Sequence, residues 1–170
     1  MNTNELFLKT AFCCMACDGE IDHSEVNLLN KIFVEEKHYF NADELQKTTD
    51  KYIEQLKKDG SFFLQKTLNE IKGAQLNNHD QCELASIAVK TIEIDRNIHY
   101  NEVAFFKKIR LILSVSDEQL LKVIPPNPEV ADQISPEEYL LPDIIDENDF
   151  SLWNADSFAS INLNTPQAPQ

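Results

Sequence analysis

Apolar residues recur every three or four positions through most of the first 124 residues, the spacing of helices with one buried face. In the first such segment, residues 5–17, the apolar side chains fall near one side of a helix. Further segments with this spacing cover residues 24–38, 42–59, 61–73, the stretch from about 78 to 94, 100–113 and a short piece after Ser116. The pattern predicts an all-α fold, a compact bundle of about seven helices.

Capping signals define several of the predicted helix ends. Asn41 and Ser116 each stand three residues before a side chain that can complete a cap, Glu44 and Gln119. Gly60 follows one predicted helix, and Ser61 can cap the next, which we expect to end near Gly73. These signals place short connections between neighbouring helices.

The chain contains an internal repeat. Residues 11–32 align without a gap on residues 88–109, at an offset of 77. The matched pairs are Ala11 with Ala88, Asp18 with Asp95, Ile21 with Ile98, Glu25 with Glu102, Val26 with Val103, Lys31 with Lys108 and Ile32 with Ile109. We therefore predict an internal duplication, with two similar helical units near residues 5–45 and 82–122.

Composition changes abruptly at Pro125. The 46 residues from Pro125 to the last residue hold all seven prolines and no lysine or arginine. We expect a helical domain over residues 1–124 and an acidic, partly docked or disordered tail over 125–170 that folding does not require. Acidic residues alternate there with apolar ones, of which Tyr139, Phe150 and Trp153 are candidates for contact with a partner.

The formal net charge of −14 disfavours nucleic acid and anionic membrane surfaces as partners. No uncharged run is long enough to span a bilayer, and the first ten residues lack an apolar leader segment. We expect a cytoplasmic protein with no direct membrane insertion. Its partner is then a protein, which the sequence does not identify.

The stretch D-G-E-I-D-H-S-E, residues 18–25, matches the second half of a calcium-binding loop. Asp18, Glu20, Asp22 and Glu25 are candidate ligands for a divalent cation, calcium or magnesium, although no cofactor is required for the fold. The same residues also suit a turn followed by a helix cap, because Asp22 is a favourable first cap residue. Both interpretations remain open from the sequence.

The second copy carries the equivalent residues Asp95 and Glu102, with Arg96 where the first copy has Gly19. Arginine adopts the left-handed turn conformation less readily than glycine, so Asp95 and Glu102 are the weaker candidates for a cation site.

Neither the cysteines nor the histidines form a recognisable catalytic or zinc motif. Cys14 and Cys17 are spaced as C-x-x-C, but they lie at the C-terminal end of a predicted helix, whose dipole opposes a reactive thiolate. No second spaced pair of zinc ligands is present, and no glycine-rich phosphate loop occurs. We expect buried cysteines and a protein that is not an enzyme.

The segments ending in M-A-C-D-G-E-I-D-H-S-E and T-I-E-I-D-R-N-I-H-Y-N-E resemble the TerB-like tellurite-resistance family over about residues 1–124. The shared pattern is an apolar helix, Asp-Gly-x-Ile, and a Glu that opens the next helix. The resemblance implies a compact helical domain of bacterial stress and tellurite-resistance systems. A related domain precedes the J-domain of a membrane-anchored co-chaperone.

Two functions follow from this resemblance. The first is a non-enzymatic stress-response adaptor that binds a protein partner and a divalent cation at its acidic turn. The alternative is an accessory domain that works with a chaperone or membrane-associated system through protein–protein contacts.

Overall fold

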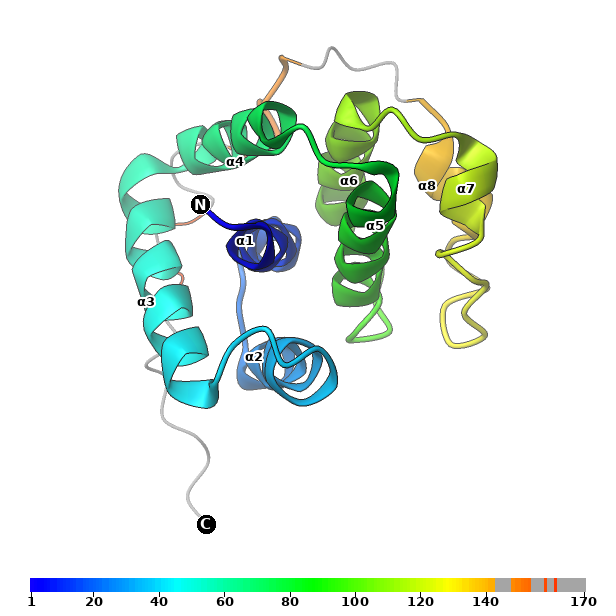
Figure 1. The fold of residues 1–170 in the computed structure, drawn as a ribbon. Helices are drawn as coiled ribbons and strands as arrows, with labels where there is room; N and C mark the ends of the chain where they lie inside the picture. Colours follow the sequence, from blue (N-terminus) through cyan, green and yellow to red (C-terminus); the bar gives the residue numbers. More distant parts are fainter. Residues whose placement is uncertain (143–147, 154–157, 159–160, 162–170) are drawn as a thin grey trace.

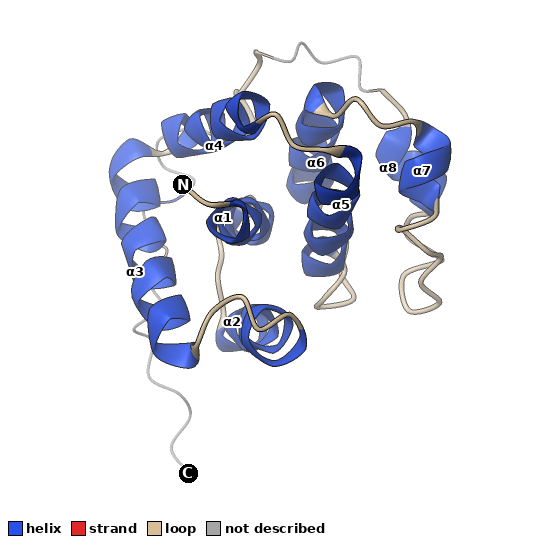
Figure 2. Cartoon of the chain, in the orientation of Figure 1, coloured by secondary structure: helices blue, strands red, loops and turns tan. Residues whose placement is uncertain are grey.

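The computed structural model describes residues 1–142, 148–153, 158 and 161. Within these residues the regular structure is entirely helical (Figures 1 and 2). The elements are α1 (Thr3–Ala16), α2 (His23–Asn30), a π-helical segment η1 (Lys31–Glu36), α3 (Ala42–Asp59), α4 (Ser61–Ala74), α5 (Asn78–Ile92), α6 (Tyr100–Ile112), α7 (Asp117–Leu121) and α8 (Pro136–Leu140). The predicted all-α fold is confirmed.

Helix α1 runs through the centre of the bundle. Figure 1 shows it nearly end-on, with α2, α3, α4 and α5 arranged around it. Every residue from Leu6 to Ala16 is buried, including the polar Lys9 and Thr10. A helix that is covered on all sides needs apolar residues all round rather than on one stripe, which explains the run A-F-C-C-M-A-C. The second repeated unit packs on this central helix of the first through α5 and α6.

Most helix boundaries agree with the capping signals. The side chain of Asn41 accepts a hydrogen bond from the Glu44 amide at 2.8 Å, and Ser116 forms a complete capping box with Gln119. The helix predicted to end near Gly73 ends one residue later, at Ala74, and is followed by Gln75 with a left-handed backbone. The predicted helix over residues 24–38 is divided into α2 and the π-helical η1.

The segment after Pro125 packs against the bundle as far as Pro142. It contains α8, which the sequence analysis did not predict and which opens with a capping box of Ser135 and Glu138. Tyr139 is fully buried and stacks edge-to-face on Phe106 of α6 at 5.5 Å between ring centroids. Trp153 is also buried and meets Phe105 of α6 edge-to-face at 6.2 Å.

The described helices include none with both the length and the apolar composition needed to cross a membrane.

Candidate functional site

The two repeated turns have the same geometry. The Asp18 carboxylate accepts a hydrogen bond from the Glu20 amide at 2.9 Å, and the Asp95 carboxylate accepts one from the Asn97 amide at 3.0 Å. Between each pair the backbone is left-handed, with φ of 83° at Gly19 and 63° at Arg96. Arg96 thus adopts the conformation that the glycine supplies in the first copy, and both loops are Asx-turns.

The equivalent helices α2 and α6 begin one residue after positions related by the same offset, Asp22 and His99. The side chain of Asp22 accepts hydrogen bonds from the Glu25 amide at 2.9 Å and the Ser24 hydroxyl at 2.6 Å. His99 makes no such cap, because its imidazole is turned toward two aspartates. The second copy has therefore exchanged a capping side chain for one that faces the neighbouring turn.

The two turns meet at His99. Its Nε2 atom lies 3.5 Å from Oδ2 of Asp18 and 3.5 Å from Oδ2 of Asp95. Glu25 and Glu102, which follow these aspartates by seven residues in each copy, are close enough to both of them to interact electrostatically. We name these four side chains, Asp18, Glu25, Asp95 and Glu102, the four-carboxylate cluster.

The two glutamates of the cluster are buried. Glu25 is 6% exposed and Glu102 5%, and one oxygen of each, Oε2 of Glu25 and Oε1 of Glu102, has no hydrogen-bond partner among the described residues. Burial first, and then the surrounding carboxylates, raise the pKa of Glu25 to about 9 and that of Glu102 to about 10. At neutral pH, in the absence of a cation, both glutamates are therefore protonated.

The pKa of Asp18 is raised as well, but by less than the pKa values of the two glutamates. Burial raises its pKa, and the hydrogen bond from the Glu20 amide and the charge of His99 act in the opposite direction. Its side chain is 13% exposed, whereas that of Asp95 is 27% exposed. The two aspartates of the cluster thus lie nearer to solvent than the two buried glutamates.

Residues after Pro125 hold both turns in place. The Gln133 side chain donates to the Arg96 carbonyl at 2.7 Å and accepts from the Ile98 amide at 2.9 Å. The Trp153 indole donates to the Cys17 carbonyl, one residue before Asp18, at 3.1 Å. The segment that composition separates from the repeats therefore bonds to the backbone of each turn.

The structure divides the predicted site residues into three groups. Asp18 and Glu25 join their second-copy equivalents Asp95 and Glu102. Glu20 and Asp22 also raise the pKa of Glu25 through their charges, but both are exposed at the surface. The proposed partner contacts Tyr139 and Trp153 are buried, so in this arrangement they offer no surface to a partner, and Phe150 is half-buried.

Sequence reasoning missed His99 and the pairing of the two copies. The prediction placed all cation ligands within one loop, as in an EF-hand. The signal that could have found the pairing was the gapless repeat itself, since two similar helix–turn–helix units often pack face to face. His99 also occupies the offset position of Asp22, which marks it as a place where the copies differ.

In this structure the side chains of the four-carboxylate cluster do not have the arrangement of metal ligands. No three histidine, cysteine or acidic side chains among the described residues converge on one point as metal ligands. The carboxylates would have to turn toward a shared ion, and His99 stands between the two aspartates. The cysteines of α1 are free thiols and are not part of the cluster.

No family model matches the chain, and no curated protein and no solved structure is significantly similar to it.

Proposed function

We propose that this protein is a non-enzymatic, TerB-like stress-response adaptor of the cytoplasm, in which the two repeated turns share one divalent cation in the four-carboxylate cluster. The observation that carries the cation site is the pair of buried glutamate oxygens without hydrogen-bond partners, close enough to Asp18 and Asp95 to interact with them electrostatically. A buried polar atom that lacks a partner costs about 1–3 kcal/mol. A cation that enters the cluster would supply the missing partner for both.

The position of His99 between the two aspartates supports the proposed cation site. The His99 imidazole, 3.5 Å from an oxygen of each aspartate, occupies the place between them that a metal ion would take. Its side chain is 40% exposed, so it has room to leave when a cation takes that place. The resulting site would be built only from carboxylate oxygens, the donors that hard cations prefer.

Calcium suits the cluster better than magnesium. Calcium accepts six to eight oxygen ligands in flexible arrangements, whereas magnesium requires a nearly ideal octahedron. A cluster whose carboxylates must rotate to reach the ion favours the less demanding cation. Binding would also displace protons from Glu25 and Glu102, so affinity should rise with pH.

A shared cation gives the adaptor a means of responding to its surroundings. Asp18 in the α1–α2 turn and Glu25 in α2 would supply two ligands, and Asp95 in the α5–α6 turn and Glu102 in α6 would supply the other two, so the ion would join the two units directly. The adaptor would then present its acidic surface, part of a net charge of −14, to a basic protein partner.

The test is thermal stability with and without calcium, in the wild type and two double variants. Glu25→Gln with Glu102→Gln removes the buried carboxylates. Glu35→Gln with Glu36→Gln replaces the same number of carboxyl groups at exposed positions on η1 and serves as the matched control. We expect calcium to stabilise the wild type and the control, by about 2.7 kcal/mol at one hundred times the dissociation constant. Equal stabilisation of the Glu25/Glu102 variant would overturn the assignment.

The adaptor role is tested separately, by capture of partners with the wild type in calcium, the wild type in chelator, and the Glu25/Glu102 variant. We expect a protein retained only by the calcium-loaded wild type and released by salt. A set of captured proteins that is identical in all three samples would contradict a cation-dependent adaptor.

A further inference from the structure

A second candidate site lies between α6 and α8. A cavity of about 340 Å³ opens between α6, the end of α8 and the chain at Asp149–Leu152. This volume is at the lower end of the range for small-molecule sites. Five residues of α6 line it: Ala104, Lys107, Lys108, Arg110 and Leu111.

The interior and the mouth of the cavity are apolar. Ala104, Leu113 and Leu140 are buried and form part of its lining. Leu111 and Leu141 stand at its mouth and are each 57% exposed, which makes them two of the five most exposed large apolar side chains described. Exposed leucines around a cavity are typical of a surface that buries an apolar ligand.

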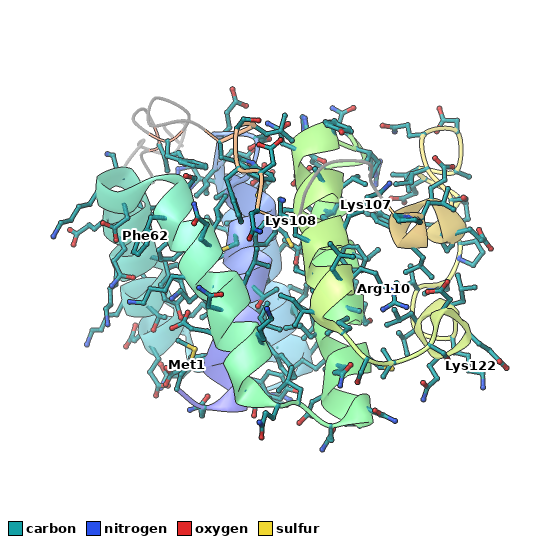
Figure 3. The ribbon with its side chains drawn as sticks, turned by 90° about the horizontal axis from the view of Figure 1, so that it is seen from above. Met1, Phe62, Lys107, Lys108, Arg110 and Lys122 are labelled. Atoms are coloured by element: carbon teal, nitrogen blue, oxygen red, sulfur yellow. The ribbon has the colours of Figure 1, made fainter. Side chains whose placement is uncertain are left out.

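Three basic residues of α6 line the same cavity, and Figure 3 shows Lys107, Lys108 and Arg110 along that helix. Arg110 is paired with Asp117 at 2.7 Å, and the Lys108 ammonium lies over the Phe150 ring at 4.6 Å from its centroid. Lys107 is half-exposed and has no ion pair within the described residues. Lys107 is therefore the basic residue of this cavity that is available to bind an anionic ligand.

We infer that this cavity binds the monoanion of a medium-chain alkyl carboxylate, with the chain against the leucines and the carboxylate at Lys107. A single unpaired cation matches a single negative charge. Asp117 and Asp149 also line the cavity, so a dianion such as a phosphate monoester would meet repulsion there. The small volume excludes long acyl chains and favours medium ones.

The first experiment titrates hexanoate, octanoate, decanoate and dodecanoate into the full-length protein below the concentrations at which they form micelles. Because each buried methylene contributes about 0.8 kcal/mol, affinity should rise about fourfold per methylene until the cavity is full and then level off. Decyltrimethylammonium, which carries the opposite charge, should bind more weakly than decanoate. No saturable binding of decanoate, or equal binding of the two decyl compounds, would overturn the inference.

The second experiment places the ligand in the cavity. Lys107→Gln should weaken decanoate binding about two- to fivefold, the contribution of an exposed charge pair, and Lys47→Gln on α3 makes the same charge change elsewhere. Leu111→Asp should weaken binding at least tenfold. Phe62→Asp, at a residue that is 61% exposed on α4, is its control. Both mutated cavity residues are at least partly exposed, so the fold should survive; decanoate affinity equal in Leu111→Asp and Phe62→Asp would refute the site.

Discussion

Replacement of Trp153 by alanine tests whether the chain after Pro142 is part of the core. The side chain is 1% exposed, and its indole donates to the Cys17 carbonyl at 3.1 Å. It also packs edge-to-face on Phe105 of α6 and against Phe150. Its removal opens a cavity beside α1 and α6 and deletes a buried hydrogen bond.

The expected loss of unfolding free energy is about 4 kcal/mol, the middle of the range for a fully buried aromatic residue replaced by alanine. Trp153→Phe keeps an aromatic ring in the same place and loses mainly the indole N–H. The Cys17 carbonyl would then still have the Asn101 side chain as a donor, at 3.4 Å. We therefore expect Trp153→Phe to cost about 1 kcal/mol, the net contribution of one hydrogen bond.

The assay is urea unfolding followed by far-ultraviolet circular dichroism, since the variants lack the single tryptophan. The midpoint should fall in the order wild type, Trp153→Phe, Trp153→Ala, with the slope unchanged. Phe62→Ala, at an exposed aromatic residue, should stay within about 0.5 kcal/mol. A Trp153→Ala midpoint no lower than that of Phe62→Ala would refute the packing of this segment on the helices.

Three further predictions follow from buried groups. Burial raises the pKa of the Cys13 thiol to about 12 and holds the pKa values of Cys14 and Cys17 well above their usual value. A thiol reagent at neutral pH should therefore label only the half-exposed Cys82 quickly in the native protein, and all four cysteines after denaturation. Rapid labelling of more than one cysteine in the native protein would contradict this burial. Lys9 is 4% exposed and lies 2.5 Å from Glu70. Measured by denaturant unfolding, Lys9→Ala should lower the free energy of unfolding by about 3 kcal/mol and Lys9→Met by less than about 1 kcal/mol. Equal losses would show that the charge of Lys9, rather than the packing of its aliphatic chain, dominates its contribution. In cation-free buffer, the contribution of Glu25 and Glu102 to stability should be greatest below about pH 4.3 and decline as the pH rises toward about 9, because the unfolded glutamates ionise near pH 4.3 while the folded pair stays protonated to about 9 and 10. The melting temperature of the Glu25→Gln, Glu102→Gln variant should therefore fall less than that of the wild type over this pH range.

Local signals in the sequence predicted the helices well. Asn41, Asp22 and Ser116 cap helices as their side chains suggest, since a cap depends on three or four consecutive residues only. The same kind of signal was present at Ser135 and Glu138 and was overlooked, because the prolines and acidic residues around them indicated a tail. The helix end predicted near Gly73 falls one residue later, at Ala74, although the left-handed residue that follows it is Gln75 and not a glycine.

The site was only half predictable because it depends on packing between the two units. Asp18 and Glu25 were identified as candidates within one loop, but their neighbours in space are Asp95 and Glu102, brought close by the packing of α1 on α5 and α6. The burial of Glu25 could not be read from its position in a capping pattern, which would suit an exposed residue equally well. The expectation that folding does not require the tail rested on composition, and the burial of Tyr139 and Trp153 argues for the opposite.

The central claim is that one cation lies between the two turns, and terbium luminescence tests it most directly. Terbium is an oxygen-binding substitute for calcium that emits when a nearby excited aromatic ring transfers energy to it. Trp153, the single tryptophan, bonds to the residue that precedes Asp18, so a terbium ion in the four-carboxylate cluster would be close to it. We predict tryptophan-sensitised emission that saturates at one ion per chain, is displaced by calcium, is lost in the Glu25→Gln, Glu102→Gln variant and persists in the Glu35→Gln, Glu36→Gln control. Absence of sensitised emission in the wild type, or equal emission from both double variants, would contradict the account.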